Sequence, residues 1–186
     1  LMSNLNLDGI LLSNLTYPQI DLNLTYILQP KTGLFEGASI LITPEETILY
    51  VGKLEESAAR QLDIVRQGKA RIVTEDIYGK LYRRVKRLGR IGVNLKFLPY
   101  HMYRRLQDLG VIPVDISEEL EEIRMIKDED EIRLIRRAAE IAEKALSDTL
   151  SLNLRGMGES ELKAEIEYRM ARMGAETAFP TIVAYD

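Results

Sequence analysis

Short apolar runs that alternate with amphipathic segments along the first 115 residues constrain the fold of this chain most strongly. The runs cover residues 9–12, 38–43, 47–51, 70–74, 90–95 and 111–114. Turn residues flank most of them, which is typical of buried strands. Strands that alternate with helices predict an α/β domain, in which a sheet carries helices packed on its faces.

Helices are expected between these strands. The apolar positions Ile77, Leu81, Val85 and Leu88 recur at helical spacing and predict a helix from Asp76 to about Gly89. Further helices are expected over residues 18–28, where Pro18 would open the helix, over 55–65 and over 100–109. Residues 44–46 read as the turn of a hairpin.

The pattern changes after residue 116, because residues 117–150 carry almost no strand signal. One apolar stripe there contains Leu120, Ile123 and Ile126, and a second contains Ile132, Ile135, Ala139, Ala142 and Leu146. Asp128 and Glu131 have the spacing of a capping box, so a helix is expected to start at Asp128. The pairs Glu129/Arg133 and Glu140/Lys144 are expected to support it. The sequence predicts one domain over residues 1–116 and a second over 117–186.

The last residues carry a further helix and the start of a strand. Residues 162–173 are amphipathic and Gly174 should end that helix. Phe179 and Pro180 then lead into the β-branched and apolar run that closes on Tyr185 and Asp186, which predicts a strand. A strand that begins and is then cut off predicts that the chain is a fragment.

The composition excludes several classes of site. The chain has no cysteine and one histidine, His101, so disulfides, cysteine zinc sites and histidine metal clusters are excluded. With a net charge of -4, the chain lacks the excess of positive charge that is typical of nucleic-acid-binding proteins. Its apolar runs are too short to span a membrane. The N-terminus lacks the basic region of a secretory signal, so a cytoplasmic location is the expectation.

Three groups of residues could carry chemistry, and each has a simpler structural interpretation. A carboxylate group could hold a hard metal ion, but its members sit where negative charge favours helix N-termini: Glu118, Glu119, Glu121, Glu122, Asp128, Glu129, Asp130 and Glu131. A basic stripe could bind nucleic acid through its charges and its aromatic rings, although it also fits the solvated face of a helix: Tyr78, Lys80, Tyr82, Arg83, Arg84, Lys86, Arg87 and Arg90. His101 has no evident nucleophile or orienting partner. These residues contain no complete active site.

Residues from Glu119 onward resemble the start of the pita-bread catalytic domain of the Xaa-Pro aminopeptidase, Xaa-Pro dipeptidase (prolidase) and creatinase family. The resemblance is carried by Ile123-Arg124, Lys127, Glu131-Ile132, Ala138-Ala139, Glu161-Leu162, Gly174-Ala175 and above all the run 178–184. The preceding region is similar to the creatinase-type N-terminal domain, a mixed sheet flanked by helices. Here the match is looser, since Gln29-Pro30 replaces the expected glycine-aromatic ending. The resemblance implies that a truncated α+β pita-bread domain follows the α/β domain.

The resemblance also implies an activity for the intact protein, namely hydrolysis of the Xaa-Pro bond of proline-containing dipeptides or peptides. Two divalent ions (Mn, Co or Zn) would share a bridging hydroxide that attacks the carbonyl carbon. All five metal ligands would lie beyond Asp186, so this chain is expected to contain no catalytic or metal-binding residue. Phe179 is carried over as an apolar wall near the substrate proline, with packing against the helix 162–173 as its structural interpretation. Homodimers are expected, with this domain covering part of the active-site entrance. Neither nucleic acid nor membrane is an expected partner.

Three other functions stay open at this point. An inactive homologue would use the fold to bind peptides or proteins, and a creatinase-like amidinohydrolase would run different chemistry on the same architecture. A nucleic-acid binder comes last, and would require binding to be lost when Arg83, Arg84 and Arg87 are reversed in charge.

Overall fold

A computed structural model describes residues 1–16 and 19–184, which divide into two compact units, Leu1–Met125 and Ile126–Asp186. Pro18, expected to open a helix, and Tyr185 and Asp186, expected at the end of a strand, lie outside the described residues. The first unit includes α7 (Ser117–Met125), whereas the domain boundary predicted from the sequence precedes that helix. No helix of the described chain is long and apolar enough to cross a membrane.

The first unit is built on a six-stranded mixed sheet with the order β4-β3-β2-β1-β5-β6. Its strands are β1 (Gly9–Ser13), β2 (Ser39–Ile42), β3 (Thr47–Tyr50), β4 (Arg71–Val73), β5 (Arg90–Val93) and β6 (Ile112–Asp115). The strand β2 pairs antiparallel with both neighbours, and the other pairs are parallel. The six strands predicted in the first 115 residues are therefore confirmed, with bounds that differ by one or two residues.

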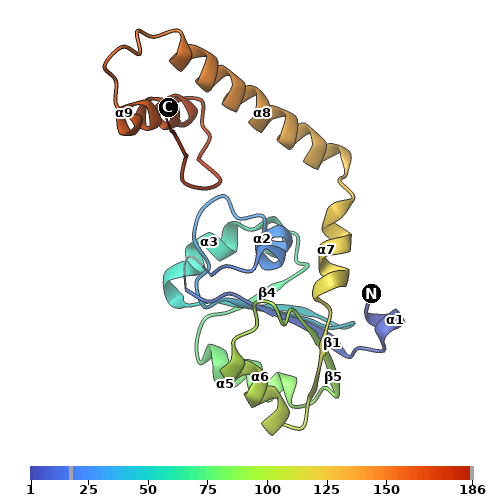
Figure 1. The fold of residues 1–186 in the computed structure, drawn as a ribbon. Coiled ribbons are helices and arrows are strands. Elements are labelled where there is room, and N and C mark those ends of the chain that lie inside the picture. Colours follow the sequence, from blue (N-terminus) through green and yellow to red (C-terminus); the bar gives the residue numbers. More distant parts are fainter. Residues whose placement is uncertain (17–18, 185–186) are drawn as a thin grey trace. The chain divides into compact units, whose positions relative to one another are not determined.

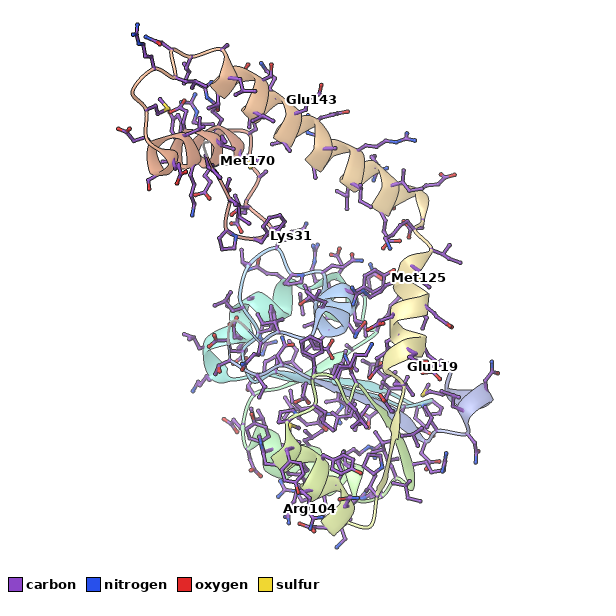
Figure 2. The ribbon with its side chains drawn as sticks, viewed as in Figure 1. Lys31, Arg104, Glu119, Met125, Glu143 and Met170 are labelled. Carbon is purple, nitrogen blue, oxygen red and sulfur yellow. The ribbon has the colours of Figure 1, made fainter. Side chains whose placement is uncertain are left out.

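Helices cover both faces of this sheet (Figure 1). Neighbouring side chains of a strand point to opposite faces, so Leu11 and Leu12 enter different cores. One core lies against α2 (Leu22–Leu28), α3 (Glu56–Gln61) and α7, and contains Leu12, Leu24 and Ile40. The other lies against α5 (Ile77–Val85) and α6 (Tyr100–Asp108). Arg104 on α6 points away from the sheet (Figure 2).

Several predicted helices have different bounds or breaks. The helix α2 begins at Leu22, because the Asp21 side chain accepts the Asn23 N–H and caps it there. The helix expected over 55–65 is broken, because Leu62 is extended and buried. It forms instead η1 (Lys53–Glu55), α3 and α4 (Asp63–Arg66). The short helix α1 (Met2–Leu5) was not predicted.

The second unit consists of α8 (Glu129–Leu150), α9 (Glu159–Arg172) and the segment after it. The capping box is confirmed: the Glu131 N–H donates to Asp128 Oδ1 and the Asp128 N–H donates to Glu131 Oε2, both at 2.8 Å. Gly174, at φ 78°, follows the end of α9 as predicted. The helices pack through the buried side chains Ile141, Ala145, Thr149, Leu162 and Ile166.

The apolar stripe from Ile132 to Leu146 is exposed, because α9 packs on a neighbouring face of α8. Two predictions about this unit are wrong. Arg133 pairs with Asp130 and Lys144 with Asp148, in place of the expected ion pairs. Residues 179–184 form no strand, because the described part of this unit offers no second strand for pairing.

Candidate functional site

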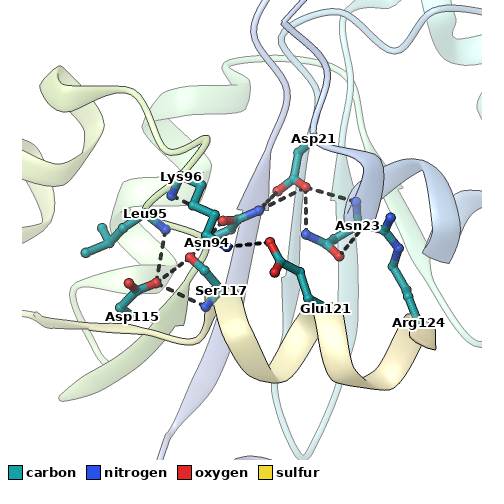
Figure 3. A network of polar contacts seen from close by, with 9 residues as sticks. All are labelled: Asp21, Asn23, Asn94, Leu95, Lys96, Asp115, Ser117, Glu121 and Arg124. Atoms are coloured by element: carbon teal, nitrogen blue, oxygen red, sulfur yellow. Dashed lines mark hydrogen bonds and ion pairs between the residues drawn. The ribbon is translucent and has the colours of Figure 1, made fainter. Parts of the chain in front are cut away.

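A network of polar side chains gathers where the parallel strands β1, β5 and β6 end (Figure 3). Asn94 directly follows β5, Asp115 ends β6, and Asp21 precedes α2. The carboxyl ends of parallel strands share one edge of a sheet, so residues far apart in the sequence meet here. This edge is also where ligands bind in many open α/β sheets, which makes the network the first place to examine for chemistry.

Asp21 lies at the centre of the network and is 1% exposed. Its Oδ1 accepts hydrogen bonds from the Asn23 N–H and the Asn23 side-chain amide, both at 2.9 Å. The Asn94 amide donates to both carboxylate oxygens at 3.1 Å. The Asp21 N–H in turn donates to Asn14 Oδ1 at 3.0 Å. Amide donors therefore satisfy a buried carboxylate that would otherwise be costly to desolvate.

The second half of the network joins β5 and β6 to α7. The Ser117 hydroxyl lies between Asn94 Oδ1, at 2.9 Å, and Asp115 Oδ1. Burial opposes ionisation of Asp115, but hydrogen bonds from Ser117 and from the Leu95 N–H, helped by the charge of Lys96, outweigh it and lower the pKa of the carboxyl. Arg124 on α7 donates to Asn23 Oδ1 at 2.9 Å.

The hydrogen-bond donors and acceptors at the centre of this network bind one another. The network therefore has a structural role. Among the residues that the structure describes, no three histidine, aspartate or glutamate side chains gather closely enough to hold a metal ion. The donor set of this part of the chain therefore does not fit a divalent metal centre. The network holds the β1–α2 connection and α7 against the sheet.

The candidate carboxylates are dispersed, as the structural interpretation predicted. Asp128 and Glu131 cap α8, and Glu121 pairs with Lys96. The carboxylates at 118, 121, 122 and 128–130 are exposed. His101 is also exposed, in the first turn of α6. None of these residues is brought into a catalytic arrangement in the described chain.

Only part of the basic stripe lines a hollow in the surface of the first unit. Lys80, Arg83 and Arg84 of α5, and Arg87 in the turn after it, line a hollow of about 260 Å³ together with Tyr50, Arg71 and Val73. Lys86 and Arg90 are not among the lining residues. Tyr78 stacks near Tyr82 with centroids 6.5 Å apart, and the Arg105 guanidinium lies 5.7 Å from the Tyr82 ring centroid. The sequence did not predict that Tyr50 and Arg71 line this hollow, because only the pairing of β3 with β4 brings these residues beside α5.

Phe179 lies in the second unit and is 71% exposed. It lines a mostly apolar hollow of about 440 Å³ whose other walls include Ala138, Ile141 and Met170. Met170 belongs to α9, so this helix borders the same hollow as Phe179. A role for Phe179 at a substrate proline stays a prediction.

Comparison with known protein families identifies the chain. Residues 1–126 match the Creatinase/Prolidase N-terminal domain. The chain belongs to the creatinase and prolidase family. Residues 133–186 match metallopeptidase family M24. The family resemblance found in the sequence and the α/β fold with a mixed sheet are thus confirmed.

Relatives in this family include Xaa-Pro dipeptidases from two archaea. The enzyme of Pyrococcus horikoshii is 32% identical over 151 residues, which cover 80% of this chain and 41% of the relative. That of Pyrococcus furiosus is 30% identical over 156 residues, covering 82% and 43%. The chain thus spans less than half the length of these two relatives.

Solved structures of the family have the same fold. The prolidase from Pyrococcus horikoshii superposes with a TM-score of 0.74 at 26% identity, covering 92% of this chain and 46% of the prolidase. The X-Pro aminopeptidase from Thermotoga maritima gives a TM-score of 0.80 at 25% identity, covering 94% and 48%. The TM-scores of the prolidase and of the aminopeptidase are similar, so the fold does not distinguish between these two activities.

Proposed function

We propose that this chain is the N-terminal portion of a metal-dependent peptidase that hydrolyses Xaa-Pro bonds. The observation that carries the proposal is the similarity to the Xaa-Pro dipeptidase of Pyrococcus horikoshii, which extends over 80% of this chain. The match of residues 133–186 to a metallopeptidase family supports the same reaction class. A proline-containing dipeptide or peptide is the proposed substrate.

The metal ions of this peptidase would be held outside the chain. Among the described residues, no three histidine, aspartate or glutamate side chains lie close enough to hold a metal ion together. Following the family resemblance, we place the ligands of two Mn, Co or Zn ions in a further part of the protein, and no catalytic step is assigned to residues of this chain. The 186-residue chain alone is expected to be inactive.

The role proposed for this part of the protein is assembly and control of substrate access. In a homodimer, the N-terminal domain would cover part of an active-site entrance, and Phe179 would supply an apolar wall for the proline ring. A cytoplasmic location and the absence of nucleic-acid partners also stay predictions. The proposed domain division remains 1–116 and 117–186.

The proposal is tested first by the mass of the native polypeptide. A chain substantially heavier than 21.2 kDa is expected. A native mass equal to 21.2 kDa would contradict the proposed peptidase, because this chain has no metal centre in its described part. A heavier protein that cleaves creatine instead of Xaa-Pro dipeptides, or that binds such peptides without cleaving them, would also contradict it.

A further inference from the structure

The basic hollow is a surface feature of the first unit that the proposed peptidase activity does not use. Lys80, Arg83 and Arg84 of α5 and Arg87 just after it form one wall. Tyr50 and Arg71 come from neighbouring parallel strands of the sheet. We use the name basic hollow for this cavity of about 260 Å³. Its volume is below that of typical sites for drug-sized ligands, so it suits a compact molecule.

Positive charge predominates in the basic hollow even after its ion pairs are counted. Glu46 binds both Arg71 and Arg84, with distances of 2.8 and 2.6 Å, and Asp76 binds Arg83 at 2.7 Å. Lys80 and Arg87 have no acidic partner within the described residues. Cations concentrated in a small concave surface attract a compact anion.

Tyr50 adds a polar group to the basic hollow. The residue is 2% exposed, and its hydroxyl makes no hydrogen bond to the described part of the chain. The hydroxyl is not fully enclosed, so it can meet a ligand in the hollow. Burial raises the pKa of this hydroxyl, and the charges of Arg71, Glu46 and Arg84 also act on it, which places it among those groups. The hydroxyl therefore keeps its proton at neutral pH and can donate it to a ligand.

Arg84 supplies a second unused donor. Its terminal nitrogen binds Glu46, but its buried Nε–H lacks a hydrogen-bond partner in the described chain. Buried donors are nearly always satisfied in folded proteins, so this buried Nε–H is unusual. This group and the Tyr50 hydroxyl could both donate to an anion with several acceptor oxygens.

We propose that the basic hollow binds a phosphate group, either as inorganic phosphate or as part of a small phosphate ester. Guanidinium groups match phosphate oxygens with paired N–H donors, and Lys80 contributes a point charge. A doubly charged anion balances this many cations better than a single carboxylate. The hydroxyl of Tyr50 would donate to the phosphate oxygen that reaches deepest.

Calorimetric titration of the chain with sodium phosphate tests this proposal, with sodium chloride at the same ionic strength as reference. One phosphate per chain is expected to bind, and chloride should give no saturable signal. Titrations with pyrophosphate and glycerol phosphate distinguish the sources. Tighter binding of glycerol phosphate indicates an ester ligand, tighter binding of pyrophosphate indicates a polyphosphate ester, and the tightest binding of orthophosphate indicates the free ion.

Two variants locate the binding in the basic hollow. The double variant K80Q/R87Q removes the two cations without acidic partners, both exposed, and should weaken binding at least about tenfold. Tyr50→Phe removes only the hydroxyl and should weaken binding about threefold to tenfold. The matched control K86Q/R66Q removes two exposed cations that do not line the hollow and should bind as the parent does.

Three results would overturn the proposal. The first is phosphate binding no stronger than chloride binding. The second is an equal loss of affinity in K80Q/R87Q and in the control, which would mean that only net charge matters. The third is unchanged affinity in Tyr50→Phe, because a loosely held surface ion would not need the Tyr50 hydroxyl.

Discussion

The side-chain amide of Asn94 donates hydrogen bonds to both carboxylate oxygens of Asp21 at 3.1 Å, across 73 positions of sequence. The contact joins the end of β5 to the residue that caps α2. Because the Asp21 carboxylate is almost fully buried, the folded state is stable only if these donors satisfy it. The same amide side chain contacts Ser117 at the start of α7, so one residue connects three parts of the first unit.

Replacing Asn94 with alanine should destabilise the first unit by about 2 to 3 kcal/mol, because it leaves a buried carboxylate without two of its hydrogen bonds. Urea unfolding followed by tyrosine fluorescence measures this, since most tyrosines lie in that unit. The control Asn4→Ala removes an exposed amide and should change the free energy of unfolding by less than about 0.5 kcal/mol. Equal stability of the two variants would show that the network contributes little.

Gly9 allows β1 to lie close to β2. A Cβ atom at this position would lie 2.9 Å from the carbonyl oxygen of Ile42, a backbone atom of the paired strand. Gly9→Ala should therefore cost roughly 1 to 3 kcal/mol. At Gly52 a Cβ atom would meet nothing within 4 Å and the backbone has ordinary angles, so Gly52→Ala should leave stability unchanged or slightly raised. Thermal unfolding of the two variants checks the difference, and an unaltered Tm in Gly9→Ala would contradict it.

The stability of the first unit should fall in acid partly through Asp8. The backbone N–H groups of Arg90 and Gly89 donate to its carboxylate at 2.8 Å and lower its pKa. A carboxyl whose pKa is lower in the folded state stabilises that state above the unfolded pKa of about 4, and this contribution is lost as the pH falls through the folded pKa. Asp8 is exposed, so the effect is small.

The variant Asp8→Asn should therefore show a shallower loss of stability between pH 7 and pH 3. Urea midpoints measured over this range give the slope. Asp63→Asn removes an exposed carboxylate held only by a distant ion pair, and should keep the parent slope. Parallel profiles for Asp8→Asn and the parent would contradict the assignment.

Local patterns in the sequence predicted the elements that depend on local interactions. The strand runs and the pair Asp128 and Glu131 were identified because turn residues and capping contacts act over a few positions. The break at Leu62 was missed, because burial of that side chain against the core outweighs helical continuity. The face of α8 that packs was not predicted, since the apolar positions of that helix extend beyond one stripe and only the position of α9 selects among them.

The sites depend on contacts between distant segments, which periodicity does not reveal. Asn94 and Asp115 each stand at the end of a strand, and that position is a signal that could have placed them together. No comparable signal connects Tyr50 with Arg84, because their proximity follows from the order of the strands and the packing of α5. The family resemblance, by contrast, follows from several short runs in a fixed order, above all residues 178–184.

The most direct test of the proposed function is hydrolysis of an Xaa-Pro dipeptide by the protein expressed from its full natural reading frame. Leu-Pro and Leu-Ala are compared in the presence of Mn²⁺ and after removal of metal by a chelator, with the 186-residue chain assayed in parallel. The account predicts cleavage of Leu-Pro that requires the metal and exceeds cleavage of Leu-Ala, and no cleavage by the 186-residue chain. Metal-independent cleavage, no preference for proline, or no cleavage by the full protein would contradict it.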